Sequence, residues 1–327
     1  MKGSAFTRTA TTAIFAGGLL ASGCSALGLD DDGAASSGKP QVVAAFYPFA
    51  FVTGRVAGDA ADVVNLTSPG VEPHDLELTP QQVATVSEAD LVVYEEGFQP
   101  AVDDAVDQNA SGATLQVTDV VPLVDTGAAD DHDHGDGAEG HADDEGTDHT
   151  RETLAGDPHL WQDPTLMAQV ADQVATDLAE LDPDHADDYR ANADALVDDL
   201  DVLDTEFRTG LADCTRTEFV TSHASFGYLA RRYDLTMVPI AGLSPGIEPS
   251  PEKLAKIQDH VAENGITTVF SETLGSSEYA DVLADDLGVD AAVLDPIEGL
   301  TDDDSDDDYF TLMRANLRAL QQANGCR

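Results

Sequence analysis

The chain from position 41 onward alternates short apolar runs with amphipathic segments. The runs rich in β-branched residues predict strands over 41–48, 62–69, 91–97 and 113–123. Between them, apolar residues recur at helical spacing and predict helices over 49–59, 79–90 and 99–108. Strands that alternate with helices pair in parallel, because each helix returns the chain to the same end of the sheet. This part of the chain therefore predicts a parallel sheet with helices on its faces.

A long helical stretch separates this region from a second one of the same kind. After a predicted helix over 163–181, the segment 182–211 has no glycine or proline between Pro183 and Gly210. A helix of that length spans about 40 Å, which is more than one lobe needs. The second region predicts strands over 218–223, 235–240, 267–272 and 290–296. Its predicted helices cover 224–232, 250–264, 276–287 and 308–322.

These patterns predict an α/β protein of two Rossmann-like lobes with parallel sheets, joined by a long rigid helix. Residues 41–181 form the predicted N-terminal lobe, residues 182–212 the interlobe helix and residues 213–327 the C-terminal lobe. Ligands of open α/β sheets bind beyond the carboxyl ends of the strands. We therefore expect the functional site in the cleft between the lobes.

The charge of the chain restricts its partners. The formal net charge is -48, from 63 acidic and 15 basic residues. Nucleic acid and anionic membrane surfaces are poor partners for such a surface, whereas small cations suit it. Much of this acidity is spread along the chain and serves solubility.

An acidic, histidine-rich loop is predicted over 128–150. Between residues 130 and 149 it has no apolar side chain larger than alanine, so it cannot form a core. Its acids alone would suit a solvated loop. Imidazoles placed among carboxylates also suit an auxiliary, weak metal-binding loop. The candidate ligands are His132, His134, His141 and His149.

The N-terminus predicts export. Residues 1–24 combine two basic residues, a short apolar run and small residues that end at Cys24. The apolar run is too short to span a membrane, and LLASGC resembles a lipobox, in which the cysteine becomes the lipidated first residue. A plain cleaved signal is the alternative. We expect an extracytoplasmic protein anchored to the cell membrane through Cys24, with residues 25–40 as a flexible tether.

Two cysteines remain after Cys24, namely Cys214 and Cys326. In an exported chain they most simply form a disulfide. The chain has no Cys-x-x-Cys pair or cluster of cysteine and histidine, so a thiolate metal site is not expected.

Three of the remaining histidines are candidate metal ligands. His74 and His223 lie at or just beyond the ends of predicted strands, and His159 lies in a proline-bounded turn before a helix. His185 and His260 lie in polar helical segments and are expected at the surface. Imidazole favours Zn²⁺, which takes four ligands, so an oxygen donor should complete the set. The candidates, in order of preference, are Asp295, Glu298 and Glu272.

Four motifs carry a resemblance to a known family. GVEPHDLELTP, DPHLWQDP, TSHASFGYLA and LDPIEG follow one another in order. Together they resemble the zinc-binding lipoproteins of high-affinity zinc-uptake ABC transporters, often called ZnuA or AdcA, within the cluster A-I metal-binding proteins. The resemblance implies two α/β lobes joined by a rigid helix, metal in the cleft between them, and delivery to a membrane permease.

The resemblance also implies metal ligands. By motif these are His74, His159 and His223 with a late carboxylate, which in some members aligns with Asp295 and in others lies near Glu298; still others use a water. Some members have a ligand glutamate directly before the first histidine, but Glu72 stands two residues before His74, so that role does not transfer. Gln162 replaces a leucine common in this motif, which we expect to be harmless.

The sequence therefore predicts a monomeric, non-enzymatic protein that captures Zn²⁺ and delivers it to an ABC permease. A manganese-binding transport protein is one alternative, although harder oxygen donors would then be expected in place of an imidazole. A zinc hydrolase would need an open coordination position and a general base, and no HExxH motif is present. A zinc-dependent adhesin or zinc buffer is a further alternative.

Overall fold

The computed structural model describes residues 38–125, 156–246, 248–274, 277–302 and 306–327. The predicted signal peptide, Cys24, most of the tether and the four loop histidines lie outside these residues. Residues Gly38–Arg327 belong to one unit, which contains two sheets.

The N-terminal sheet has four parallel strands in the order β2-β1-β3-β4. The strands are β1 (Gln41–Ala44), β2 (Asp62–Asn65), β3 (Leu91–Tyr94) and β4 (Ala113–Gln116). The helices between them are α1 (Tyr47–Ala57), α2 (Pro80–Glu88) and α3 (Pro100–Asn109). The predicted start of α2 is confirmed, because the Thr79 hydroxyl accepts the Gln82 backbone N–H and the Gln82 side chain accepts from the Thr79 backbone.

All four predicted strands of this sheet were too long, and the last of them by the most. The run over 113–123 is extended only as far as Gln116, and a short helix, α4 (Val117–Val120), follows. The Gln116 side chain accepts the Thr118 backbone N–H and so caps this turn. The apolar residues that suggested a longer strand, Val117 and Val121, are buried in the core instead.

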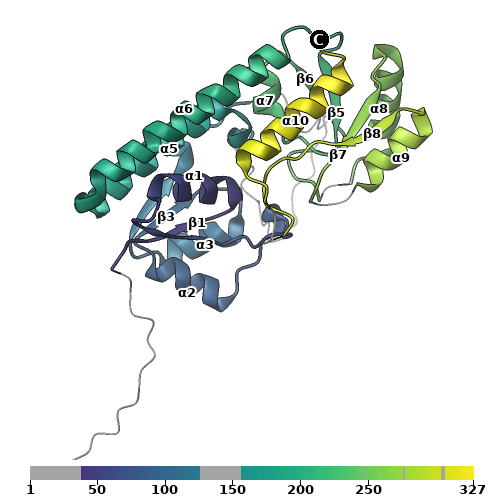
Figure 1. Cartoon of the computed structure of the whole chain (residues 1–327). Helices are drawn as coiled ribbons and strands as arrows, with labels where there is room; N and C mark the ends of the chain where they lie inside the picture. The colour runs from purple at the N-terminus through teal and green to yellow at the C-terminus, as the bar shows by residue number, and fades with distance from the viewer. Residues whose placement is uncertain (1–37, 126–155, 247, 275–276, 303–305) are drawn as a thin grey trace, which may run out of the picture. The chain divides into compact units, whose positions relative to one another are not determined.

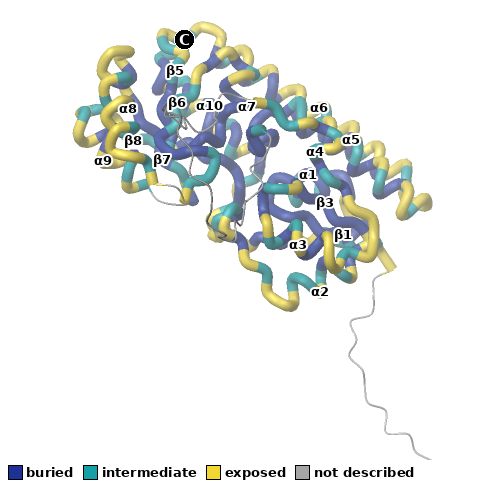
Figure 2. Tube along the Cα trace, turned by 180° about the vertical axis from the view of Figure 1, so that it is seen from behind, coloured by how far each residue is buried: buried dark blue, intermediate teal, exposed yellow. Residues whose placement is uncertain are grey.

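The C-terminal sheet repeats the same topology, with four parallel strands in the order β6-β5-β7-β8. The strands are β5 (Glu218–Thr221), β6 (Thr236–Pro239), β7 (Thr268–Ser271) and β8 (Asp290–Val293). The helices are α7 (Gly227–Arg232), α8 (Pro251–Asn264), α9 (Glu278–Leu287) and α10 (Tyr309–Asn324). Figure 2 shows the central strands buried and the outer faces of α2, α8 and α9 exposed.

Two long helices lie side by side along this unit (Figure 1), α5 (Pro164–Leu181) and α6 (Ala186–Gly210). A 3-10 turn (Pro183–His185) replaces the first residues of the predicted long helix. Helix α6 leads from the N-terminal region into β5. It contacts α1, where Asn192 donates to the Val56 carbonyl, and α10, where Arg314 pairs with Glu206. The predicted long helix that links two α/β lobes is therefore confirmed.

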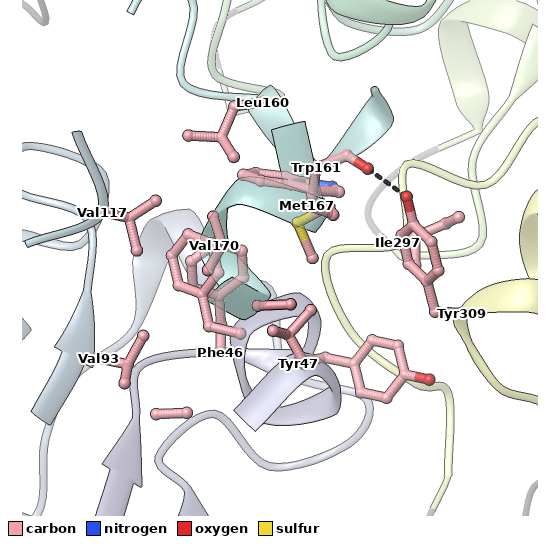
Figure 3. Close-up of a cluster of buried hydrophobic side chains, with 14 of the residues drawn as sticks. Phe46, Tyr47, Val93, Val117, Leu160, Trp161, Met167, Val170, Ile297 and Tyr309 are labelled. Carbon is pink, nitrogen blue, oxygen red and sulfur yellow. Dashed lines mark hydrogen bonds between the residues drawn. The ribbon is translucent and has the colours of Figure 1, made fainter. Parts of the chain in front are cut away.

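A buried aromatic cluster fixes the segment that precedes α5. The Trp161 ring is fully buried and packs edge-on against Phe46 and Phe98 of the N-terminal region. Its Nε1–H donates to the Pro296 carbonyl. The Tyr309 hydroxyl donates to the Trp161 carbonyl, as Figure 3 shows. Gln162, also fully buried, donates to the same Pro296 carbonyl. This segment therefore joins the N-terminal core to the turn after β8.

The predicted pairing of Cys214 with Cys326 is confirmed as a disulfide. It joins the segment after α6 to the segment after α10 across a sequence separation of 112 residues. Closing a loop of that length stabilises a fold by roughly 4–5 kcal/mol in the chain-entropy description.

Within the described residues, no helix is both long and apolar enough to cross a membrane.

Candidate metal centre

His74 lies in a single 3-10 turn (Pro73–Asp75) between β2 and α2. The Glu72 carboxylate caps this turn by accepting the His74 backbone N–H at 3.3 Å. The loop is tied to a distant segment, because the Gly70 N–H donates to the Leu300 carbonyl at 2.7 Å. Gly70 has a φ of 77°, and a Cβ there would lie 3.1 Å from the Thr301 carbonyl oxygen, so glycine suits both the conformation and the close approach.

His159 lies just before a 3-10 turn (Leu160–Gln162) and is fully buried. Two residues earlier, the Asp157 carboxylate accepts the His159 backbone N–H at 2.9 Å. The same oxygen, Oδ1, lies 2.7 Å from Nδ1 of the His159 ring. Asp157 is itself held by an isolated β-bridge to Val124.

His223 follows the carboxyl end of β5 and is also fully buried. The Thr221 hydroxyl donates to the His223 carbonyl at 2.8 Å. The Glu272 carboxylate, which follows the neighbouring strand β7, accepts the His223 backbone N–H at 3.0 Å and lies 2.7 Å from ring Nδ1. Parallel neighbouring strands thus bring these two residues together.

Glu298 completes a compact group of four side chains. Its Oε1 lies 3.5 Å from His74 Nε2, 3.3 Å from His159 Nε2 and 3.2 Å from His223 Nε2. Each of the four side chains offers one ligand atom, and these atoms all lie within 4.8 Å of one another. The His159, His223 and Glu298 side chains are at most 1% exposed, and His74 is 10% exposed. Three imidazoles and one carboxylate in this arrangement suit a tetrahedral Zn²⁺ ion.

Several polar atoms of this group have no hydrogen-bond partner among the described residues. They are Nε2 of His74, Nε2 of His159 and the second carboxylate oxygen of Glu298. Buried polar atoms in folded proteins are normally paired, and a bound ion is one partner that satisfies them. The donor set therefore fits a metal ion.

Asp295, the first choice for the fourth ligand, lies outside this group. Its Oδ1 accepts the Ile297 N–H at 2.7 Å, and its backbone N–H and carbonyl both bond to Asn316. Ile297 has a φ of 59°, an unusual value for a β-branched residue, which turns the chain sharply. This turn brings the alternative candidate, Glu298, to the histidines. Glu272 contacts the far side of the His223 ring and is not in the group either.

The two expected surface histidines lie away from the site. The His185 side chain is 50% exposed and that of His260 is 38% exposed. Each has one carboxylate beside its ring, Asp182 and Glu218 respectively.

The charges of the group depend on burial and on its carboxylate. Burial lowers the pKa of His74, although Glu298 opposes this effect. For His223, burial disfavours the charged ring, but Glu272 and Glu298 outweigh it and raise the pKa well above its usual value. Burial likewise opposes charge on His159, while Asp157 and Glu298 raise its pKa. Complete burial would raise the pKa of Glu298, but its histidine neighbours outweigh this effect and lower the pKa well below its usual value.

Sequence reasoning did not find the roles of Asp157 and Glu272. Asp157 stands two residues before His159, which is the only local signal of its contact with that ring. Glu272 was considered only as a ligand. Its contact with His223 spans 49 residues and depends on the adjacency of β5 and β7.

The fold is that of a two-lobed α/β protein, and it contains a buried group of side chains that could hold one metal ion. The chain belongs to the family described as "Zinc-uptake complex component A periplasmic", which it matches over residues 42–323. The predicted resemblance is therefore confirmed.

Relatives of the chain carry related names. It is 34% identical over 293 residues to "Zinc-binding lipoprotein AdcA" of Streptococcus pneumoniae, which covers 88% of this chain and 56% of that protein. It is 32% identical over 291 residues to "High-affinity zinc uptake system protein ZnuA" of Bacillus subtilis, covering 87% and 88%. The chain thus spans little more than half the length of its AdcA relatives.

Solved structures support the same grouping. The structure of Zn(II)-bound AdcA from Streptococcus pneumoniae has a TM-score of 0.71 and 32% identity, with 88% of this chain and 58% of that chain covered. The laminin-binding protein Lmb of Streptococcus agalactiae has a TM-score of 0.72 and 31% identity, with coverage of 87% and 99%.

Proposed function

We propose that this protein captures Zn²⁺ outside the cytoplasm and delivers it to an ABC permease. The observation that carries the proposal is the buried group of His74, His159, His223 and Glu298, whose ligand atoms lie within 4.8 Å of one another. Membership of a zinc-uptake family supports the delivery step. The ion is the cargo, and we propose no catalytic activity.

Zinc fits this donor set better than manganese does. Mn²⁺ prefers carboxylate, carbonyl and water oxygens, whereas Zn²⁺ binds readily to imidazole. Three imidazole nitrogens against one carboxylate therefore favour zinc.

The relative Lmb is described as having adhesin and metal transporting activity. That description applies to Lmb, and it identifies no residue of this chain that would bind a protein partner.

Metal analysis tests the proposal directly. Protein purified without an affinity tag is expected to hold one tightly bound Zn²⁺ in the cleft, and an excess of Mn²⁺ should not displace it. Mass spectrometry under native conditions and competition with a chelating dye would measure both. Tighter binding of manganese than of zinc would overturn the zinc assignment.

The domain and localisation assignments remain part of this proposal. Residues 1–24 serve as the lipoprotein signal peptide, and lipidated Cys24 anchors a monomer to the outer face of the cell membrane through the tether over 25–40. The lobes are residues 41–181 and 213–327, joined by 182–212. The name "lipoprotein" of the AdcA relative supports the anchor.

The histidine-rich loop over 128–150 is proposed as a weak zinc collector. Its composition offers no apolar core, so ordering it would use much of the binding free energy and its affinity should be lower than that of the buried group. Deleting residues 130–149 is expected to remove the weaker binding and keep one tight site, as measured by calorimetry. Loss of the tight site would make the loop a ligand donor, and unchanged stoichiometry would make it a solvated spacer.

A further inference from the structure

Two of the three candidate ligand imidazoles have a carboxylate on the ring nitrogen that faces away from the site. Asp157 lies 2.7 Å from Nδ1 of His159, and Glu272 lies 2.7 Å from Nδ1 of His223. Both carboxylates also accept the backbone N–H of the same histidine, at 2.9 and 3.0 Å. Each histidine is therefore held at its backbone and at its ring by one acidic residue.

These contacts are buried and firmly anchored. The Asp157 side chain is 1% exposed and the Glu272 side chain 5% exposed, so water cannot readily replace either carboxylate. Asp157 is held by its bridge to Val124, and Glu272 directly follows strand β7. The two carboxylates come from different parts of the chain but make the same pair of contacts, Asp157 through one oxygen and Glu272 through both.

The His74 ring has no such carboxylate contact among the described residues. In the part of the chain that the structure describes, no side chain hydrogen-bonds to its ring outside the metal group. Its ring packs edge-on against Phe98 at 4.5 Å, and Glu72 holds only its backbone N–H. His74 therefore serves as an internal comparison for the other two ligands.

Building on the proposed zinc capture, we propose that Asp157 and Glu272 are positioning residues for the metal centre. A carboxylate that accepts a hydrogen bond from Nδ1–H fixes the tautomer in which Nε2 carries the free lone pair. It also fixes the ring orientation and makes the nitrogen a stronger donor. In this protein, both fixed Nε2 atoms point at Glu298, within 3.3 Å of its Oε1.

The variants Asp157→Ala and Glu272→Ala test the inference, with Asp157→Asn and Glu272→Gln as conservative forms. Zinc affinity is expected to fall about tenfold to a hundredfold in each alanine variant. The amide variants should fall less, because an amide oxygen still accepts from Nδ1–H but has no charge. In Glu272→Gln the amide nitrogen would then face the His223 backbone N–H, so that contact would be lost. Competition with a chelating dye measures the affinity, and the absorption spectrum of bound Co²⁺ reports the ligand geometry.

A matched control lies on strand β5, which His223 follows. Glu218 begins β5 and contacts the ring of surface His260 at 2.7 Å, so Glu218→Ala and Glu218→Gln make the same chemical changes away from the site. They should leave the zinc affinity and the Co²⁺ spectrum unchanged.

The melting temperature of the metal-free protein separates positioning from simple structural support. If all four site variants bind zinc within threefold of the unaltered protein and change only the melting temperature, the positioning role is wrong. Where an alanine variant does not fold, the amide variant decides by the same criterion. Absence of tight zinc binding in the unaltered protein would instead overturn the proposed function.

Discussion

Replacing His159 or His223 with alanine is expected to abolish tight zinc binding. Structural zinc sites bind with about 10–16 kcal/mol, so one ligand of four corresponds to roughly 2.5–4 kcal/mol, or about a hundredfold to a thousandfold in affinity. Both side chains are fully buried, and the ligand group among the described residues consists of three histidines and Glu298. No other imidazole of the described part belongs to this group and could take their place. Competition with a chelating dye of known affinity would measure the loss.

The variant His74→Ala is expected to show a loss of the same order. Its ring is less firmly held than the other two, but it supplies one of only three nitrogen donors in the group found among the described residues. The surface histidines give matched controls, because His185 and His260 also lie beside carboxylates but are far more exposed. Their alanine variants should bind zinc as the unaltered protein does. Any of the three site variants that stays within tenfold of the unaltered affinity would remove that histidine from the ligand set.

The sequence predicted the three histidines as candidate metal ligands because each lies near a local feature that indicates a crevice. His74 and His223 follow strands, and the carboxyl ends of parallel strands face a common crevice. His159 stands in a proline-bounded turn before helix α5. Each of these features can be read within ten residues of the histidine concerned.

The alternation of strands and helices could also be predicted from the sequence, but the residues at which the strands end could not. The apolar run over 41–48 suggested a strand of eight residues, whereas β1 ends at Ala44 and α1 begins at Tyr47. Phe46 is apolar because it is buried in the aromatic cluster, whatever its backbone conformation. Apolar patterns report burial, and burial continues past the end of a strand.

The carboxylate that lies beside the histidines could not be chosen from sequence, because its position depends on one backbone turn. Asp295 and Glu298 are three residues apart and both follow β8. The positive φ of Ile297 and the donors from Trp161 and Gln162 to the Pro296 carbonyl determine which of them reaches the histidines. Those contacts join residues that are more than 130 positions apart in the chain.

The variant Glu298→Gln is expected to show the second large loss of zinc affinity. The glutamate is the only carboxylate in the ligand group of the described residues, and its oxygen lies within 3.5 Å of all three Nε2 atoms. Glutamine is nearly the same size but has no charge, so it is a weaker donor to Zn²⁺ and cannot offset the ion's positive charge. We expect a loss of about a hundredfold in zinc affinity, close to that of losing one ligand.

The variant Asp295→Asn is the matched comparison, since it makes the same change three residues earlier. An asparagine oxygen can still accept the Ile297 N–H, and the backbone bonds to Asn316 do not involve the side chain. Its zinc affinity is therefore expected to fall by less than about tenfold, below the range of residues that hydrogen-bond directly to a metal ligand. A larger loss of zinc affinity in Asp295→Asn than in Glu298→Gln would show that the aspartate is the fourth ligand after all.

The variant Glu298→Gln has a second readout, in the histidines of the metal-free protein. Because Glu298 raises the pKa of His159 and of His223, removing its charge should lower both pKa values. These rings would then lose their protons at lower pH in an NMR titration.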